Sequence, residues 1–567
     1  MDYLTKIAGR KDWDWLNEIA LTTLSRGYLS ANIPQNDIKQ AAIERANAIV
    51  DSAEKILQKK LPTIRHGLKR GWVSPSSPVW SNFGARSGLP VSCNGSFMED
   101  NMESILYANA EIGMMTKQGA GTSCYMGKLR PQGAPISGGG KSQGPVHFAR
   151  LLQETVSVIS QSNVRRGNCA IWLDVEHPDI EEWLTMRSIT DGIHHPIQHL
   201  SFGICITDQW MKEMLAEEKG GKKRLLMVKI INKRRSSGYP YIFFTDNVNT
   251  QKPQVLKDKN IPIYASNLCA EIMLPCDEET SFVCNLSSVN VLYFEEWKNT
   301  ELVQEMIYFL DAILSDYIQK TANVPFMERA HNFAKKWRAV GLGTLGYHSY
   351  LQAKKIPFES EEARNVNIEI HKHVAEQSMQ ASQKMAKEYG EPDGLKGYGQ
   401  RHLCLNAIAP TTSSSIILGQ VSPSIEPWES NYFENDNAKS VFTQKNLILE
   451  DLLEEKGKNT KEVWFSILQR AGSVQHLDFL TQREKETFKT FIEIAPAEII
   501  QQASDRQKFI DQGQSINLKI DPAQDKKYNV GIIVDAWKKG IKSLYYHKGV
   551  NMAQELARTN ACKACEA

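Results

Sequence analysis

Three residues near the middle of the chain combine side chains that suit chemistry better than packing. Asn267, Cys269 and Glu271 alternate with apolar residues, so an extended backbone would point the amide, the thiol and the carboxylate to one side. A second cysteine, Cys284, follows in the segment FVCNL. The alternative is that both cysteines are buried free thiols, which behave as small hydrophobic residues.

The cysteines are too sparse for a disulfide-stabilised fold, since the whole chain has 10 in 567 residues. Only Cys562 and Cys565 form a CxxC pair. Structural zinc sites usually need a second such pair or two spaced histidines, and none stands nearby, so thiol–disulfide exchange is the better interpretation. The polar, small residues around this pair predict a flexible tail, which could carry a dithiol into a site and out again.

Two further runs carry polar groups with more than one interpretation. The hydroxyl residues Thr411, Thr412, Ser413, Ser414 and Ser415 precede an apolar segment. They could cap a helix or hold an anion at its N-terminus, and their number favours a phosphate. Tyr545 and Tyr546 are either two strand aromatics, one facing in and one out, or a pair of phenols that relays protons and electrons.

Other candidate motifs are weaker. The loop at 161–168 holds Arg165 and Arg166, which suit phosphate or base contacts, but a solvated loop explains them equally well. His194, His195 and His199 lack a carboxylate or cysteine at matching spacing, so ordinary loop or core histidines are favoured over a metal site. The run GGGKS at 138–142 is not a phosphate loop, because Pro135 stands where the first glycine is required.

The sequence pattern predicts only some of the helices and strands that must position these residues. Apolar periodicity predicts a helical region over residues 1–75 and long helices over 302–322 and 360–389. The formal charge of +2 argues against bulk binding of nucleic acid or a membrane surface. No apolar run is long enough to span a bilayer and the first residues lack a signal-peptide pattern, so we expect a cytoplasmic protein.

Several ordered motifs together resemble the large, catalytic subunit of class I ribonucleotide reductase, from about Trp15 to the C-terminus. These are SPVWSN, VSC at Cys93, DNMESI from Asp100, GKLRPQGAPI with Arg130, NVRRGN with Arg165, HPDIEEWL, SNLCAEIMLP with Cys269, FVCNLS with Cys284, APTTSSS, the tyrosine pair and the cysteine-bearing tail. The resemblance implies a ten-stranded α/β barrel of two antiparallel five-stranded halves, with Cys269 on a central finger loop. The domains would be a helical N-terminal region (1–75), the barrel (76–547) and a redox-active tail (548–567).

The resemblance also implies roles in reducing ribonucleoside diphosphates to 2'-deoxyribonucleoside diphosphates. Cys269 would form a transient thiyl radical, Glu271 would act as base and Asn267 would orient the substrate. Cys93 and Cys284 would supply the electrons and end as a disulfide. The tail dithiol, recharged by thioredoxin or glutaredoxin, would reduce that disulfide again. The substrate would contact Ser77, Ser92, Arg165 and the five hydroxyl residues Thr411, Thr412, Ser413, Ser414 and Ser415.

The resemblance also implies a radical-generating partner subunit, a homodimer and nucleotide effectors. The chain itself would bind no metal or organic cofactor, and a separate metal-containing small subunit would deliver a radical through Tyr545 and Tyr546. A homodimer would bind dNTP or ATP effectors near Asp100, Met102, Arg130 and Gln161. Ser137 stands where some relatives carry arginine. The catalytic pattern begins almost at once, which predicts that the N-terminal ATP-cone of many relatives is missing.

Two alternatives remain open on the sequence. One is an adenosylcobalamin-dependent class II reductase, which shares the barrel and its cysteines. The other is an inactive nucleotide-binding homologue. The tyrosine pair argues against the first and the five redox cysteines against the second.

Overall fold

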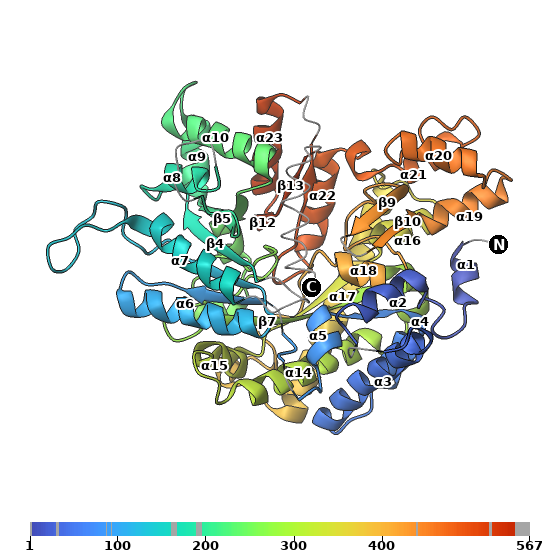
Figure 1. Cartoon of the computed structure of the whole chain (residues 1–567), viewed down its shortest axis with the longest axis horizontal. Helices are drawn as coiled ribbons and strands as arrows, with labels where there is room; N and C mark the ends of the chain where they lie inside the picture. Colours follow the sequence, from blue (N-terminus) through green and yellow to red (C-terminus); the bar gives the residue numbers. More distant parts are fainter. Residues whose placement is uncertain are drawn as a thin grey trace.

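The computed structural model describes residues 3–29, 33–86, 88–91, 93–159, 167–188, 196–437, 440–520 and 524–549. Its N-terminal region is helical, as predicted. The helices are α1 (Tyr3–Ala8), α2 (Glu18–Ser25), α3 (Ile38–Leu57) and α4 (Pro62–Arg70). In α3 the buried residues recur at helical spacing, at Ala42, Ala46, Ile49 and Ala53. This face packs against α14 (Leu302–Thr321) at the lower edge of Figure 1.

Five parallel strands form the first half of the barrel. They are β2 (Cys93–Phe97), β3 (Thr122–Tyr125), β4 (Cys169–Asp174), β5 (Ser201–Ile206) and β6 (Tyr241–Phe244). The helices between them are α6 (Met102–Lys117), α7 (Gly144–Val158), α8 (Ile180–Thr185), α9 (Asp208–Ala216) and α10 (Lys222–Ser237). Parallel neighbours need crossover connections of this kind, which cover the sheet with helices.

The second half repeats this arrangement in the opposite direction. Strand β7 (Phe282–Asn290) pairs in parallel with β8 (Val340–Leu345). Parallel bridges then join Leu342 to Asn406 and Ile408 to Gln514, and the Tyr545 amide donates to the Ile516 carbonyl. Residues 404–408, residues 512–516 and the stretch that begins with β12 (Ser543–Leu544) therefore act as the last three barrel strands.

Antiparallel contacts close the ring. β2 pairs with β7 at one seam, and β6 pairs with β12 at the other. The predicted barrel of two five-stranded halves is thereby confirmed. The short strand β1 (Val73–Pro75) also pairs with β7, so the sheet takes in residues just before position 76.

The outer helices of the second half are α13 (Phe294–Trp297), α14, α15 (Glu328–Trp337), α16 (Tyr347–Ala353), α17 (Glu361–Tyr389), α22 (Pro496–Gln507) and α23 (Lys526–Lys538). A smaller lobe at the upper right of Figure 1 carries β9 (Tyr432–Asn437), β10 (Ser440–Lys445), α19 (Leu447–Glu455), α20 (Lys461–Gln469) and α21 (Gln482–Thr487). The remaining elements are α5 (Ser77–Asn82), α11 (Thr245–Thr250), α12 (Gln254–Asp258), α18 (Thr412–Ile417), β11 (Leu518–Lys519), β13 (His547–Lys548) and single 3₁₀ turns at Gln35–Asp37, Val291–Tyr293, Asp393–Leu395 and Phe491–Glu493. No helix among the described residues is long and apolar enough to cross a membrane.

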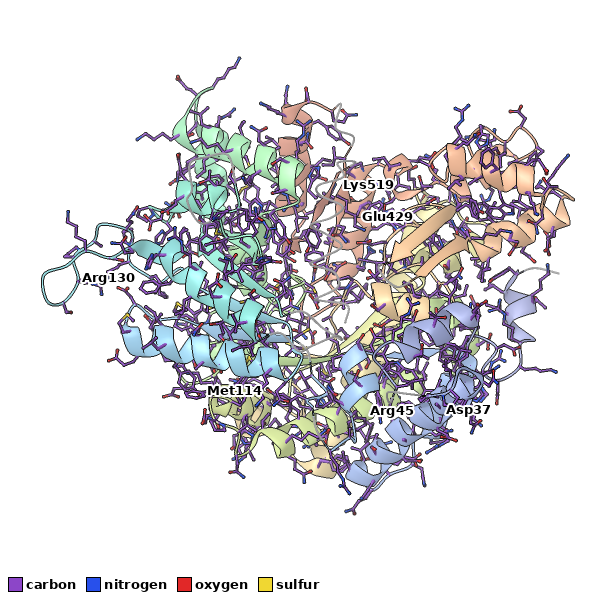
Figure 2. The ribbon with its side chains drawn as sticks, viewed as in Figure 1. Asp37, Arg45, Met114, Arg130, Glu429 and Lys519 are labelled. Carbon is purple, nitrogen blue, oxygen red and sulfur yellow. The ribbon has the colours of Figure 1, made fainter. Side chains whose placement is uncertain are left out.

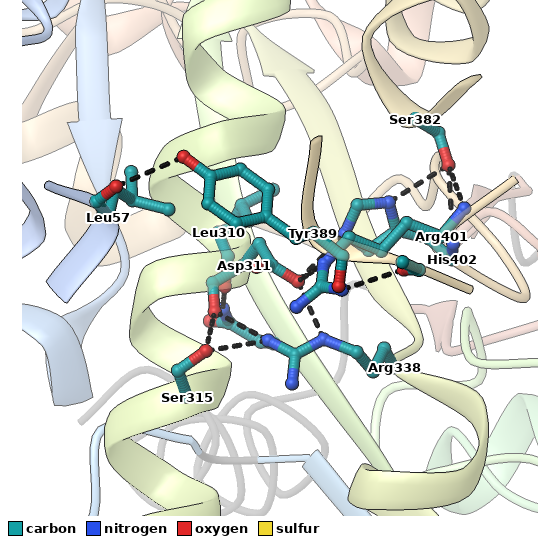
Figure 3. A network of polar contacts seen from close by, with 11 residues as sticks. Leu57, Leu310, Asp311, Ser315, Arg338, Ser382, Tyr389, Arg401 and His402 are labelled. Carbon is teal, nitrogen blue, oxygen red and sulfur yellow. Dashed lines mark hydrogen bonds and ion pairs between the residues drawn. The ribbon is translucent and has the colours of Figure 1, made fainter. Parts of the chain in front are cut away.

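A buried ionic network fixes α14 to the barrel (Figure 3). Asp311 of α14 accepts hydrogen bonds from Arg338 at 2.7 Å and from Arg401 at 3.1 Å, and its carboxylate lies 3.1 Å from His402 Nε2. Burial alone would raise the pKa of this carboxyl, but Arg338, His402 and Arg401 hold it well below its usual range. Arg338 and Arg401 precede two adjacent barrel strands, so the network ties the outer helix to both.

Candidate active site

Cys269 lies at the tip of a loop that runs from residue 261 to residue 281, between α12 and β7. No strand forms over this segment, so a shared strand face for Asn267, Cys269 and Glu271 is wrong. The backbone turns after Asn267, whose Oδ1 accepts from the amides of Glu271 at 3.0 Å and Ile272 at 3.1 Å. Ala270 takes a positive φ of 64°, which a side chain tolerates only at a cost of about 1–2 kcal/mol.

The barrel holds this loop tip through three backbone carbonyls. Ser515 Oγ donates to the Cys269 carbonyl at 2.7 Å, and Ser543 Oγ donates to that of Ala270 at 2.6 Å. The Gly513 amide donates to the Glu271 carbonyl at 2.8 Å. Contacts from two barrel strands thus compensate the strained turn and fix Cys269 in place.

One cavity collects nine of the predicted catalytic, relay and substrate-binding residues. Its lining includes Cys93, Cys269, Glu271, Tyr545 and the hydroxyl residues Ser74, Ser76, Ser77, Ser287, Ser288, Thr411, Thr412, Ser413 and Ser414. The buried Oγ atoms of Ser74 and Ser287 and the Oε1 atom of Glu271 have no hydrogen-bond partner among the described residues. Buried polar atoms are normally paired, so this cavity suits a polar ligand.

A second cavity, of about 210 Å³, lies between α1, α16 and the α19–α21 lobe. Its lining holds salt-bridging residues such as Asp451 and Glu484 but no cysteine. The chemistry therefore belongs to the cavity around Cys269.

Glu271 is the titratable group best placed to act as a base in this cavity. The residue is 1 % exposed, and burial raises the pKa of its carboxyl to about 7. Ser515 Oγ donates to Oε2 at 3.2 Å and opposes that rise. A carboxylate with a pKa near neutrality can accept a proton and return it under physiological conditions.

Cys93 and Cys284 face each other across the β2–β7 seam, where they are directly paired in antiparallel register. Opposite residues in such a pair have Cβ atoms about 4.5–5.5 Å apart, so a disulfide needs only a small adjustment. The two thiols differ in environment. Cys93 is partly exposed and lines the cavity, whereas Cys284 is fully buried, and burial raises the pKa of its thiol well above the usual value.

Tyr545 and Tyr546 form a close pair of rings, tilted by 55° to each other, that begins at the cavity. Their ring centroids are 4.2 Å apart, and Tyr545 lines the cavity. Two tyrosines that we did not single out in the sequence extend the cluster. Tyr241 lies 4.7 Å from the Tyr545 ring, and the hydroxyl of Tyr239 lies 3.2 Å from that of Tyr546. The alternating aromatics of Tyr239-Pro240-Tyr241 were a usable signal for an inward-facing strand end.

The hydroxyl run forms the start of the short helix α18. Thr411 has φ 53° and its Oγ1 accepts from the Ser424 amide at 2.7 Å. The first amides of a helix have no intrahelical acceptor, so those of residues 412–414 can face a ligand. Ser415 is different: it is buried, does not line the cavity and donates to the Thr412 carbonyl.

The comparisons with known proteins point in one direction. The model of the ribonucleotide reductase barrel domain matches residues 91–221, 216–397 and 392–547. A solved structure, the alpha subunit of a class Id ribonucleotide reductase from Actinobacillus ureae, is 46% identical, with a TM-score of 0.88 over 97% of this chain and 99% of that chain. The ribonucleoside-diphosphate reductase large subunit of Invertebrate iridescent virus 3 is 31% identical over 85% of this chain and 86% of its own length.

The chain belongs to the ribonucleotide reductase large-subunit family. A more distant relative is the vitamin B12-dependent ribonucleoside-diphosphate reductase of Mycobacterium tuberculosis (strain H37Rv), 26% identical over 97% of this chain and 80% of its own length. The higher identity to the class Id alpha subunit favours the class I branch of the reductase family over the cobalamin-dependent branch.

In this reductase chain the predicted effector residues lie apart from the cavity, near the start of α6. Arg130 Nε donates to Asp100 Oδ2 at 2.6 Å, and Arg130 lies where the projecting loop leaves the body of the molecule (Figure 2). Met102 is 52% exposed at the first turn of α6. The predicted residues Ser92, Gln161, Arg165, Cys562 and Cys565, and the histidines 194 and 195, lie outside the described part of this reductase chain.

Proposed function

We propose that this chain is the catalytic subunit of a ribonucleoside-diphosphate reductase, which converts ribonucleoside diphosphates to 2'-deoxyribonucleoside diphosphates. One observation carries the proposal. A single cavity with many hydroxyl groups in its wall brings together Cys269 on a fixed loop tip, a buried carboxyl with a pKa near 7, the Cys93 thiol opposite Cys284, and Tyr545 of the tyrosine pair.

The residues divide the reaction between them. A Cys269 thiyl radical abstracts the hydrogen from C3', while Glu271 accepts the 3'-hydroxyl proton. The 2'-hydroxyl then leaves as water, with its proton supplied by Cys93. Cys93 and Cys284 together deliver two electrons and end as a disulfide, and the C3' hydrogen returns from Cys269. Asn267 uses Oδ1 to hold the loop turn, which leaves its Nδ2 group to orient the substrate.

The radical must come from outside the described residues, since a thiol is not easily oxidised without a source. Tyr545 and Tyr546 would relay it from a separate small subunit that holds the metal cofactor. The 4.2 Å separation of the two ring centroids and the position of Tyr545 on the cavity wall support this route. The tail cysteines Cys562 and Cys565 would reduce the Cys93–Cys284 disulfide, and thioredoxin or glutaredoxin would recharge them.

Substrate recognition would use the hydroxyl-rich side of the cavity. The diphosphate would sit against the amides and hydroxyls of residues 411–414 and against Ser77. Ser92 and Arg165 would complete the substrate contacts. Ser415, buried behind this surface, would support it and make no contact with the substrate.

Regulation would act at a homodimer surface formed by α6 and α7. These helices pack together and expose a group of apolar side chains, namely Met102, Leu106, Leu151, Val158 and Ile159. Such a group suits contact with another protein. A dNTP or ATP effector would meet Asp100, Met102 and Arg130 at this surface, with Gln161 in the adjoining loop.

The deciding experiment is a CDP reduction assay with a candidate radical-bearing small subunit, with adenosylcobalamin, and with neither. Turnover only with the small subunit supports the class I mechanism. Turnover with adenosylcobalamin alone would contradict it in favour of the class II alternative. Nucleotide binding with no turnover in any arm would favour the inactive homologue.

A further inference from the structure

The two redox cysteines of the seam are not equivalent, and a buried glutamine accounts for the difference. Gln512 is fully buried, and its Nε2 group donates to Cys284 Sγ at 3.4 Å. The same Nε2 donates to the Val340 carbonyl at 3.1 Å, and Oε1 accepts from the Met273 amide at 3.3 Å. These two backbone partners fix the orientation of the amide, so a donor faces the sulfur.

The residues around Cys284 also leave space for its sulfur atom. Gly341 of β8 lies beside it, and a Cβ at that position would stand 3.2 Å from Sγ.

The titratable groups nearest to Cys284 are Cys93 on β2, Glu271 on the loop, Asp511 and Cys404. In its ionised form each of them would disfavour a thiolate at Cys284. Among the described side chains, Gln512 is the one that donates a hydrogen bond to this sulfur.

We propose that the Cys93–Cys284 disulfide is reduced with a fixed polarity: an incoming thiolate attacks Cys93, and Cys284 leaves as a thiolate stabilised by Gln512. This inference rests on the proposed function and specifies how its resting state is regenerated. Gln512 acts as a positioning residue, since it touches the leaving sulfur and no substrate atom.

The step balances without a further reagent. The attacking thiolate forms a bond to Cys93 Sγ, the Sγ–Sγ bond breaks, and its electron pair stays on Cys284, which then takes a proton. A second thiol of the reductant displaces Cys93 and carries away the oxidised equivalent as a disulfide. Attack at Cys93 follows from access, since Cys93 lines the cavity and Cys284 does not. Departure of Cys284 follows because attack at Cys93 leaves it as the only sulfur to depart, and the Gln512 hydrogen bond offsets part of the cost that burial imposes on its thiolate.

The first test maps the polarity in the full-length chain with Cys562→Ser and Cys565→Ser, after oxidation with diamide. A short pulse of glutathione is quenched with iodoacetamide, and both cysteines are assigned by peptide mass spectrometry. The expected product carries glutathione on Cys93 and the alkyl group on Cys284. Glutathione mainly on Cys284, or equally on both, would overturn the polarity. Failure of diamide to join Cys93 to Cys284 would instead contradict the proposed function.

The second test isolates Gln512. Gln512→Met keeps the side-chain length without the donor, and the rate of disulfide reduction by glutathione should fall about tenfold, because a hydrogen bond to a charged group is lost. In the Cys93→Ser background, alkylation of Cys284 should require a higher pH in Gln512→Met than in the parent.

The matched control is Gln514→Met. Gln514 is a buried glutamine that bonds to Arg506, Gln507 and Ala503, and among the described residues its side chain makes no hydrogen bond to either cysteine. Thermal melting separates loss of fold from loss of the donor. Reduction at the parental rate in a folded Gln512→Met, or the same slowing in Gln514→Met, would overturn the role of Gln512.

Discussion

Glu271, the proposed base, also lowers the stability of the fold near neutral pH. Its carboxyl has a pKa of about 7 in the fold and about 4.3 in an unfolded chain. Between these values the unfolded chain loses the proton and the folded chain keeps it. Glu271 therefore costs stability progressively as pH rises from about 4 to about 7, and the full cost persists above that range.

We predict that Glu271→Gln abolishes turnover and yet raises the melting temperature at pH 8, with little change at pH 4. Wild-type kcat should rise with pH up to about 7, because the base must be ionised. Thermal scans at both pH values and a pH–rate profile check the prediction. A destabilised variant at pH 8 would contradict the assigned pKa.

The tyrosine pair belongs to the element scale, because both rings are placed by the end of one barrel strand. Tyr545 and Tyr546 follow β12, and Arg234 donates to the Tyr545 carbonyl at 3.0 Å. We predict that Tyr545→Phe and Tyr546→Phe each lower turnover at least about a thousandfold while substrate affinity is unchanged, since only the phenolic hydroxyl is removed. Calorimetric nucleotide binding beside the CDP assay checks this, and normal activity in either variant would exclude the relay.

The buried network around Asp311 leads to a prediction about the stability of the fold. Asp311→Asn leaves Arg338 and Arg401 buried without their countercharge, which should cost about 3–5 kcal/mol. Because the folded pKa of Asp311 is depressed, its stabilising effect is present above pH 4 and is lost as pH falls further. Urea unfolding at pH 7 and at pH 3 should therefore show a larger difference at pH 7.

The control for this prediction is Asp393→Asn, which removes an exposed pair with Lys396 and should change stability very little. An equal effect in both variants would mean that burial of the network contributes nothing.

The sequence predicted single elements well wherever the signal was local. The helix predicted over 360–389 forms as Glu361–Tyr389, with Ser360 as its N-cap. The strands gave little signal, since they are short and buried on both faces, as β3 and β5 are, and so lack the alternation of a half-buried strand. The barrel was predicted from the motifs and not from periodicity.

The candidate site, too, could be predicted from the sequence only where the signal was local. Asn267, Cys269 and Glu271 stood out because their polarity is unusual for neighbouring residues, but their turn depends on Ser515 and Ser543. Gln512 gave no signal, because its contact with Cys284 spans 228 residues of sequence. Residues that act through such distant contacts become visible only when the strands are placed side by side.

At the scale of the whole molecule, α6 and α7 lie together on the left in Figure 1, and their exposed apolar side chains predict self-association. Leu106→Glu and Val158→Glu together should weaken the dimer about a hundredfold or more, because charge would enter an apolar contact. Sedimentation velocity over a range of concentrations measures the change. Leu225→Glu, an equally exposed leucine on α10, is the matched control, and an unaltered dimer in the double variant would place the interface elsewhere.

The central claim is that one cavity couples a Cys269 radical to a dithiol that supplies two electrons for each product. The most direct measurement is a single-turnover experiment with the pre-reduced chain, its small subunit and CDP, without external reductant. With Cys562→Ser and Cys565→Ser, about one dCDP per chain should form, together with one Cys93–Cys284 disulfide, because each dithiol supplies electrons for one product. Cys269→Ala should give neither. Product formation without that disulfide, or by the Cys269→Ala chain, would contradict the account.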